Sequence, residues 1–162
     1  MDHYKTVVMD FLQSDRAVFV NADCQFDVPP RAEQERKPEQ CHCDAVAIDL
    51  RHGAVYLCEI AIEDQLPALL NKLTEWTKHW GSIKAILQRE YKVPADWRVH
   101  VWVFIPSAAT ETLEDELETL RHKAGTRFKV KLTVLEEIQP WNTSGWLRKE
   151  EDWEIKRPRT LT

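Results

Sequence analysis

The chain has 162 residues, of which 43% are hydrophobic and 30% are charged, a composition that fits one folded domain and argues against disorder along the whole length. Its 22 lysines and arginines against 27 aspartates and glutamates give a net charge of −5, which excludes a general positive coat for nucleic acid but leaves room for a small basic cleft. The 4 glycines form neither a Walker loop nor a GxGxxG pattern, so P-loop NTPases and ordinary dinucleotide enzymes are disfavoured.

The predicted elements occur in the order helix, three strands, long helix, strand, helix and strand. Helices are assigned where apolar residues recur at helical spacing, and strands where short apolar or alternating runs end at turn residues. Strands separated by helices predict a mixed sheet with helices on both faces, which is an α/β sandwich. The elements are expected over residues 2–13, 17–26, 44–50, 54–62, 64–91, 98–106, 112–123 and 128–138.

Three segments carry the most specific local signals. The polar, proline-bounded stretch 29–40 is predicted as a solvated loop. The strands over 44–50 and 54–62 form a hairpin and are apolar nearly throughout, which is typical of strands covered on both faces. Gly81 marks the point where the long helix is expected to bend or split.

A single domain is expected over residues 1–139, followed by a tryptophan-rich, charged tail over 140–162. Tryptophans among cations suit the stacking of single-stranded nucleic acid, but the acidic residues of the tail nearly cancel its positive charge. We favour a tail whose tryptophans dock onto the body of the chain or onto a second copy, which would make a homodimer. The first five residues, MDHYK, lack a signal-peptide core, and no apolar run is long enough for a membrane helix, so we expect a cytoplasmic protein that does not enter a membrane.

The four cysteines are expected as free thiols, because no secretion signal precedes them. Cys24, Cys43 and Cys58 are predicted as small apolar side chains on buried strands. The run Cys41-His42-Cys43 spaces its thiols more closely than structural zinc sites usually do, so zinc binding there is a weaker alternative.

Glu59 is the charged residue whose position most needs an explanation. Leu57 and Ala61 share its face of the predicted strand, and both faces of that strand are apolar, so Glu59 must be largely buried. A buried, unpaired carboxylate costs free energy or undergoes a rise in pKa. Glu59 therefore needs a metal ion, an arginine or a hydrogen-bond network.

Asp44 opens the neighbouring strand, and the hairpin places it opposite Glu59 to within about one residue of register. Two opposed carboxylates repel each other unless a cation lies between them, and oxygen ligands of this kind suit Mg²⁺ or Mn²⁺. The alternative is an Asp44 at the surface and a Glu59 that pairs with an arginine or lysine of a helix.

The stretch DAVAID at 44–49, followed by VYLCEIA at 55–61, resembles the core of the PD-(D/E)XK phosphodiesterase superfamily, which has the restriction-endonuclease-like fold. The pattern of that family is an acid at the start of one hairpin strand and an acid-x-lysine on the next, and the order of elements over 2–138 is also similar. The resemblance implies a restriction-endonuclease-like domain, Asp44 and Glu59 as ligands of Mg²⁺ or Mn²⁺, and DNA or RNA as a partner.

The chain departs from the family pattern at Ala61, which stands where the lysine is expected. In this superfamily the lysine can instead come from the next helix along the chain. Lys72 is our first candidate because it lies at the margin of the apolar stripe, and Lys84, within the stripe, is the second, while Lys78 points away. The alternative for each is a lysine stem that lies on the core with its amine in water.

Two functions are compatible with these residues. In the first, Asp44 and Glu59 hold a metal ion that activates water, Lys72 positions that water, and the protein is a Mg²⁺-dependent nuclease. In the second, favoured by Ala61 and the negative net charge, the fold is catalytically inactive and acts as a protein-interaction or nucleic-acid-binding module.

Three further residues carry weaker expectations. Asp10 on the first helix is an additional acid of a kind that the superfamily sometimes brings to the site. Asp49 is expected at the surface or paired with a helix. It has an odd number and Asp44 an even one, so the two side chains point to opposite faces of the strand. His79 is expected at the surface.

Overall fold

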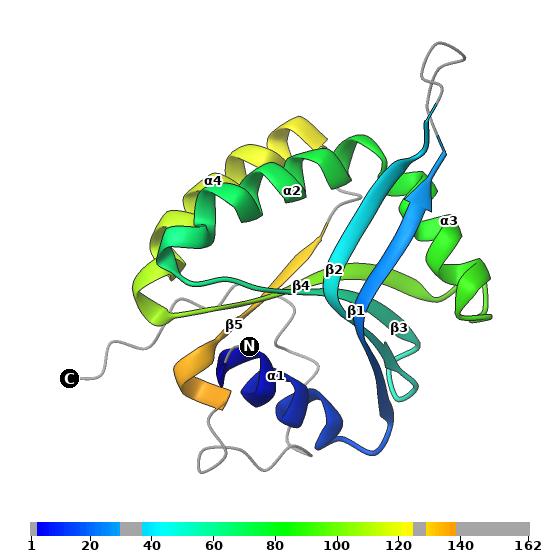
Figure 1. Ribbon diagram of the computed structural model, residues 1–162, viewed down its shortest axis with the longest axis horizontal. Coiled ribbons are helices and arrows are strands. Elements are labelled where there is room, and N and C mark those ends of the chain that lie inside the picture. Colours follow the sequence, from blue (N-terminus) through cyan, green and yellow to red (C-terminus); the bar gives the residue numbers. More distant parts are fainter. Residues whose placement is uncertain (1–2, 30–36, 125–128, 139–162) are drawn as a thin grey trace.

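The computed structural model describes residues 3–29, 37–124 and 129–138, which form an α/β fold with a five-stranded mixed sheet flanked by helices (Figure 1). This confirms the predicted α/β class with a mixed sheet flanked by helices and, apart from the division of the long helix, the predicted order of elements. The elements are α1 His3–Gln13, β1 Val18–Val28, β2 Glu39–Asp49, β3 Ala54–Ile60, α2 Leu66–Lys78, α3 Trp80–Glu90, β4 Arg98–Ile105, α4 Thr110–Ala124 and β5 Val130–Val134.

The strands lie in the order β1-β2-β3-β4-β5. The first three, consecutive in the chain, are antiparallel neighbours, whereas β4 runs parallel to β3 and β5 runs parallel to β4. Parallel neighbours need a crossover, and here helices α2 and α3 supply the first crossover and α4 supplies the second. Helices α2 and α4 cover one face of the sheet and α1 covers the other, as Figure 1 shows.

Two apolar cores result from this layering. The larger core joins α2, α3 and α4 to one face of the sheet, and the smaller core joins α1 and the turn at 135–138 to the other face. β3 and β4 are buried along almost their whole lengths, which confirms that the apolar hairpin strand at 54–60 is covered on both faces. No helix among the described residues is both long and apolar enough to cross a membrane.

The predicted long helix is two helices, and the break lies at His79 rather than at Gly81. His79 leaves the helical conformation with φ −113° and ψ 14°, and Gly81 lies inside α3. The ring of His79 is instead 2.7 Å from the Glu39 carboxylate of β2, measured from Nε2 to Oε2. That contact joins residues far apart in the chain, so the sequence pattern around His79 does not contain it.

Two strand boundaries also differ from the predictions. β2 begins at Glu39, inside the predicted loop 29–40, because β1 and β2 pair as far as Val28 and Glu39. β5 ends at Val134, and the predicted strand continues as a short 3₁₀ turn over 135–138. At the start of β2 the sequence pattern is compatible with a strand or a loop, and at the end of β5 with a strand or a turn. Pairing with the neighbouring strand determines which of the two forms.

The β1–β2 hairpin changes the face that it buries at the level of Asp23 and Asp44. Val18 of β1 belongs to the core under α1, whereas Cys24 and Val28 belong to the core under α2 and α3, although all three have even numbers. Asp23 has φ 52°, a left-handed conformation that aspartate tolerates better than most residues, and Lys5 pairs with its carboxylate. The hairpin therefore crosses from one layer to the other, and Asp44 lies at the crossing.

Candidate functional site

Asp44 and Glu59 lie opposite each other at the point where β2 leaves β3. The β2–β3 pairs run from Asp49 and Ala54 to Ala45 and Cys58, and the next pair in this register is Asp44 with Glu59. The predicted register is therefore confirmed. Glu59 is 4% exposed, which confirms that it is buried, and Asp44 is half-buried.

The third candidate residue, Lys72, reaches this pair from α2. Its Nζ is 2.9 Å from Oε2 of Glu59, and its side chain is 32% exposed. The ammonium also lies 6.0 Å from the ring centre of Trp76, one helical turn further along α2. Lys84, the second candidate, is exposed on α3, and Lys78 pairs with Glu75 at 2.5 Å. Of the three lysines considered, Lys72 is the one that contacts Glu59.

The side chain of Asp44 is hydrogen-bonded to the end of β3. Its Oδ2 accepts a hydrogen bond of 2.8 Å from the backbone N–H of Ile60, just after Glu59. The side chain of β2 thus replaces a ladder hydrogen bond where the two strands separate. The hydrogen bond fixes the direction of the Asp44 carboxylate beside Glu59.

Burial dominates the electrostatics of Glu59. It raises the pKa of Glu59 to about 7, the positive charge of Lys72 opposes that rise, and the negative charge of Asp44 adds to it. Oε2 is paired with Lys72, but Oε1 is buried and has no hydrogen-bond partner among the described residues. A buried oxygen without a donor is costly, so Oε1 is a position where a cation would be favourable.

The donor set fits a hard divalent cation. Carboxylate oxygens from two neighbouring strands are the ligand type that Mg²⁺ and Mn²⁺ take in proteins, and Oε1 of Glu59 is the oxygen left for one. The Lys72 ammonium neutralises part of the same negative charge, as in the alternative in which Glu59 pairs with a helix lysine. The geometry alone is compatible with both interpretations.

Ala61, where the resemblance leads us to expect a lysine, is enclosed in the core. It is 3% exposed within the core under α2, and its N–H donates a hydrogen bond of 3.1 Å to the Phe104 carbonyl. Asp10 is exposed on α1, on the opposite face of the sheet from Glu59, so the expectation that Asp10 approaches the site is wrong.

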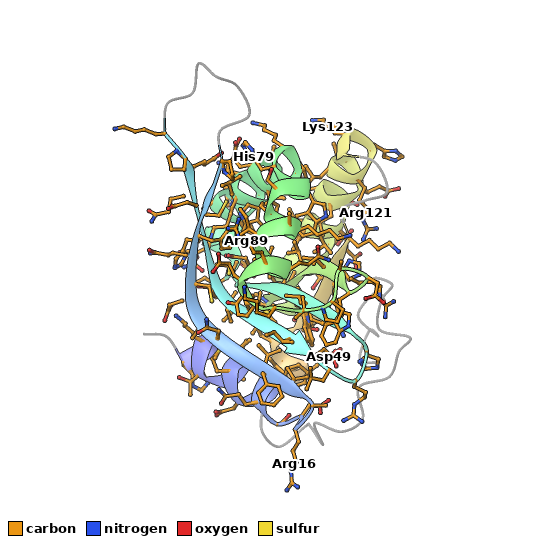
Figure 2. The ribbon with its side chains drawn as sticks, turned by 90° about the vertical axis from the view of Figure 1, so that its right-hand side faces the viewer. Arg16, Asp49, His79, Arg89, Arg121 and Lys123 are labelled. Atoms are coloured by element: carbon orange, nitrogen blue, oxygen red, sulfur yellow. The ribbon has the colours of Figure 1, made fainter. Side chains whose placement is uncertain are left out.

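Asp49 is buried at 5% exposure, so a surface position for it is wrong. Its Oδ1 accepts hydrogen bonds from the N–H groups of Arg51 and His52 at 3.0 and 3.2 Å, and its Oδ2 is 2.7 Å from Nδ1 of His52. Asp49 therefore caps the β2–β3 turn. In Figure 2 it lies at the opposite end of the molecule from His79.

Asp49→Ala is expected to lower the free energy of unfolding by about 2 kcal/mol, because the turn loses a buried acceptor of several hydrogen bonds. Urea unfolding followed by tryptophan fluorescence measures the loss. Asp64→Ala, which removes an exposed acid, is the control and should change stability by less than about 0.5 kcal/mol. Equal stabilities of the two variants would show that Asp49 does not hold the turn.

All four cysteines are free and buried, as predicted for Cys24, Cys43 and Cys58. His42 is exposed, whereas Cys41 and Cys43 on either side of it are buried in one core, so the three side chains do not converge on one ion. The group of three potential metal ligands within the described ranges is a different one, formed by Glu39, Glu75 and His79, whose ligand atoms lie within 4.8 Å of one another.

Sequence reasoning misses the group of Glu39, Glu75 and His79. His79 is 9% exposed, so its expected surface position is wrong, and its ring contacts Glu39. The four-residue spacing of Glu75 and His79 is a visible signal in the sequence. Glu39 gives no such signal, because it falls in the stretch predicted as a loop. Both glutamates are exposed, and Glu75 already pairs with Lys78.

Comparisons with protein-family models, with curated proteins and with solved structures found no match to this chain. The tail at 140–162 lies outside the described residues, and so does the homodimer expected from it.

Proposed function

We propose that this protein is a divalent-metal-dependent phosphodiesterase, a nuclease acting on DNA or RNA with a restriction-endonuclease-like fold. The observation that carries the proposal is the convergence of Asp44, Glu59 and Lys72 from β2, β3 and α2, with Lys72 Nζ 2.9 Å from Glu59. The resemblance to the superfamily requires an ammonium beside the carboxylate pair. Ala61 has none, and Lys72 supplies one from α2.

The arrangement of the sheet supports the finer fold assignment. Three antiparallel strands are succeeded by a helical crossover and a parallel fourth strand, which is the order that the resemblance implies. The carboxylates lie where the second and third strands part, just beyond the last paired residues Ala45 and Cys58.

Each side chain has a role in this function. Asp44 and Glu59 would hold Mg²⁺ or Mn²⁺, with Oε1 of Glu59 as one donor atom. Asp44 keeps its orientation through the Ile60 N–H. When bound, such an ion polarises a phosphodiester oxygen and lowers the pKa of a water ligand. Lys72 donates hydrogen bonds from its partly exposed ammonium and holds the attacking water or a phosphate oxygen in place.

A catalytically inactive interaction module is the second candidate. The observation that favours it is the Glu59–Lys72 ion pair, in which the lysine ammonium balances the buried charge without a metal ion. The net charge of −5 also opposes tight binding to nucleic acid.

Calorimetric titration of Mn²⁺ and Mg²⁺ separates the two candidates. The wild type should bind the metal ion and release protons near pH 7. Glu59 retains a proton at this pH because its pKa is raised, and the bound ion displaces that proton. Asp44→Asn should weaken binding by at least about tenfold. Asp115→Asn, at an exposed position on α4, is the matched control and should bind as the wild type does. Equal binding by Asp44→Asn and the wild type would remove the metal site and leave the interaction module.

A further inference from the structure

Two thiols face each other across the β1–β2 ladder. Cys24 of β1 and Cys43 of β2 are register partners, and both lie in the core under α2 and α3. Opposed residues of antiparallel strands have Cα atoms about 4.5 or 5.5 Å apart. Both values fall within the range of roughly 4.4 to 6.8 Å that a disulfide spans. The backbone therefore places this pair within bridging distance.

The other two cysteines lack this arrangement. Phe26 stands opposite Cys41 on β1, and Ala45 stands opposite Cys58 on β2. Cys58 is fully buried, and burial raises the pKa of Cys41 to about 11. Within the described ranges, Cys24 and Cys43 are thus the cysteines that pair across strands, and the other two serve as internal controls.

Tyr91, at the end of α3, lies against Cys24. Its hydroxyl is 3.3 Å from Cys24 Sγ and accepts a hydrogen bond of 3.2 Å from the Asn21 amide. Because the phenol oxygen is already an acceptor, its proton is free to point at the sulfur and stabilise a thiolate. Hydrogen bonding from Cys43, opposed by burial and assisted by Tyr91, lowers the pKa of Cys24 to about 6.

A cavity of about 600 Å³ gives access to Cys24 from outside. It lies between β1 and α3, and its lining includes Asn21, Cys24, Arg89 and Tyr91. Figure 2 views the molecule from the side on which α3 and the hairpin lie next to each other, with Arg89 labelled. A volume of this size accommodates a small organic molecule. Cys43 is 0% exposed and does not line the cavity, so Cys24 is the thiol that an incoming molecule meets first.

We propose that Cys24 and Cys43 form a redox modification site, at which a low-molecular-weight disulfide oxidises the pair to a cross-strand disulfide. The Cys24 thiolate attacks one sulfur of the small disulfide, forms a mixed disulfide and expels one thiolate. Cys43 then attacks Cys24 Sγ, the S–S bond of the mixed disulfide breaks, and the proton of Cys43 passes to the departing sulfur, which leaves as the second small thiol. Two protein thiols are oxidised, and one small disulfide is reduced to two thiols.

Glutathione disulfide is the probe for this site. The reduced full chain is incubated with it near neutral pH, free thiols are then alkylated, and peptides are examined by mass spectrometry. We expect a Cys24–Cys43 linkage to form at least about tenfold faster than Cys58 becomes modified. Cys58→Ser, the matched control, should form the same linkage at the wild-type rate.

The two single variants test the order of the steps. Cys43→Ser should accumulate the mixed disulfide on Cys24, whereas Cys24→Ser should leave Cys43 as unreactive as Cys58. Tyr91→Phe keeps both thiols and should slow the first step several-fold, which maintains the test even if a cysteine variant folds poorly. Reaction of Cys24 no faster than that of Cys58, or unchanged modification of Cys43 in Cys24→Ser, would overturn the proposal.

Discussion

Glu59→Gln is expected to lower Mn²⁺-dependent cleavage of plasmid and single-stranded DNA by at least about 100-fold, if the protein is the proposed nuclease. Glutamine keeps the shape of the side chain but removes the negative charge that a cation needs at Oε1. The variant should fold, because a neutral amide is less costly to bury than a carboxylate is, and the partly exposed Lys72 can turn its ammonium to water. Rates are measured with purified full-length chain over a series of Mn²⁺ concentrations.

Two controls make this experiment decisive. Glu116→Gln removes an exposed glutamate of α4 and should cleave as the wild type does. Circular dichroism establishes that Glu59→Gln is folded. Identical residual cleavage by the wild type and Glu59→Gln would point to a contaminating nuclease and would refute catalysis at this site, while metal binding without cleavage would favour the inactive module.

The second large effect is a pH-dependent loss of stability in Lys72→Met. At pH 8 the variant must either bury an ionised Glu59 without its partner or keep Glu59 protonated far above its ordinary pKa, and we expect the free energy of unfolding to fall by about 3 kcal/mol. At pH 5 Glu59 is protonated in the folded wild type, because its pKa is raised to about 7, and the loss should be about 1 kcal/mol or less.

Proton linkage gives the sign of this dependence. Between the ordinary glutamate pKa of 4.5 and the folded value of about 7, the folded state binds more protons at Glu59 than the unfolded state does. The contribution of Glu59 to stability is therefore full below pH 4.5 and declines by about 3 kcal/mol as the pH rises through 7. Urea unfolding of the wild type, Lys72→Met and Glu59→Gln at several pH values measures it.

His100 works in the opposite direction and has to be subtracted. Burial, assisted by Lys129 and Arg98, lowers the pKa of His100 to about 4, so its contribution to stability rises with pH between about 4 and the ordinary value of 6.5. The wild type alone can thus show a flat pH profile. The difference between the wild type and Glu59→Gln isolates Glu59, and a constant difference from pH 4.5 to 8 would contradict its raised pKa.

The sequence is most informative where a short-range period constrains the answer. The alternation of apolar residues around Glu59 predicts its burial, and the short hairpin turn predicts that Asp44 stands opposite it. The helical angle selects Lys72, which contacts Glu59. The burial of Glu59 and the position of Asp44 opposite it concern one strand and its neighbour across a short turn. Backbone geometry leaves few alternatives over such a distance in the chain.

The misses have the opposite character. His79, where the helix breaks, contacts Glu39, which is distant in the chain, and the early start of β2 accompanies pairing with Val28. Parity says which side of its strand Asp49 faces but not what covers that side, so it does not predict that Asp49 is buried. No local pattern contains the partner in any of these cases.

At Asp23 the hairpin changes the face that it buries. The packing of the hairpin is therefore more sensitive to an insertion or deletion than to a substitution. Deleting Gln25 of β1 would turn Phe26 and Val28 outward together and bring Asp27 to the interior. A substitution at one of these positions removes a few contacts. An insertion or deletion would instead exchange the buried and exposed faces of β1 over all the residues that follow it. Natural variation in β1 should therefore consist of exchanges of residue type at constant length.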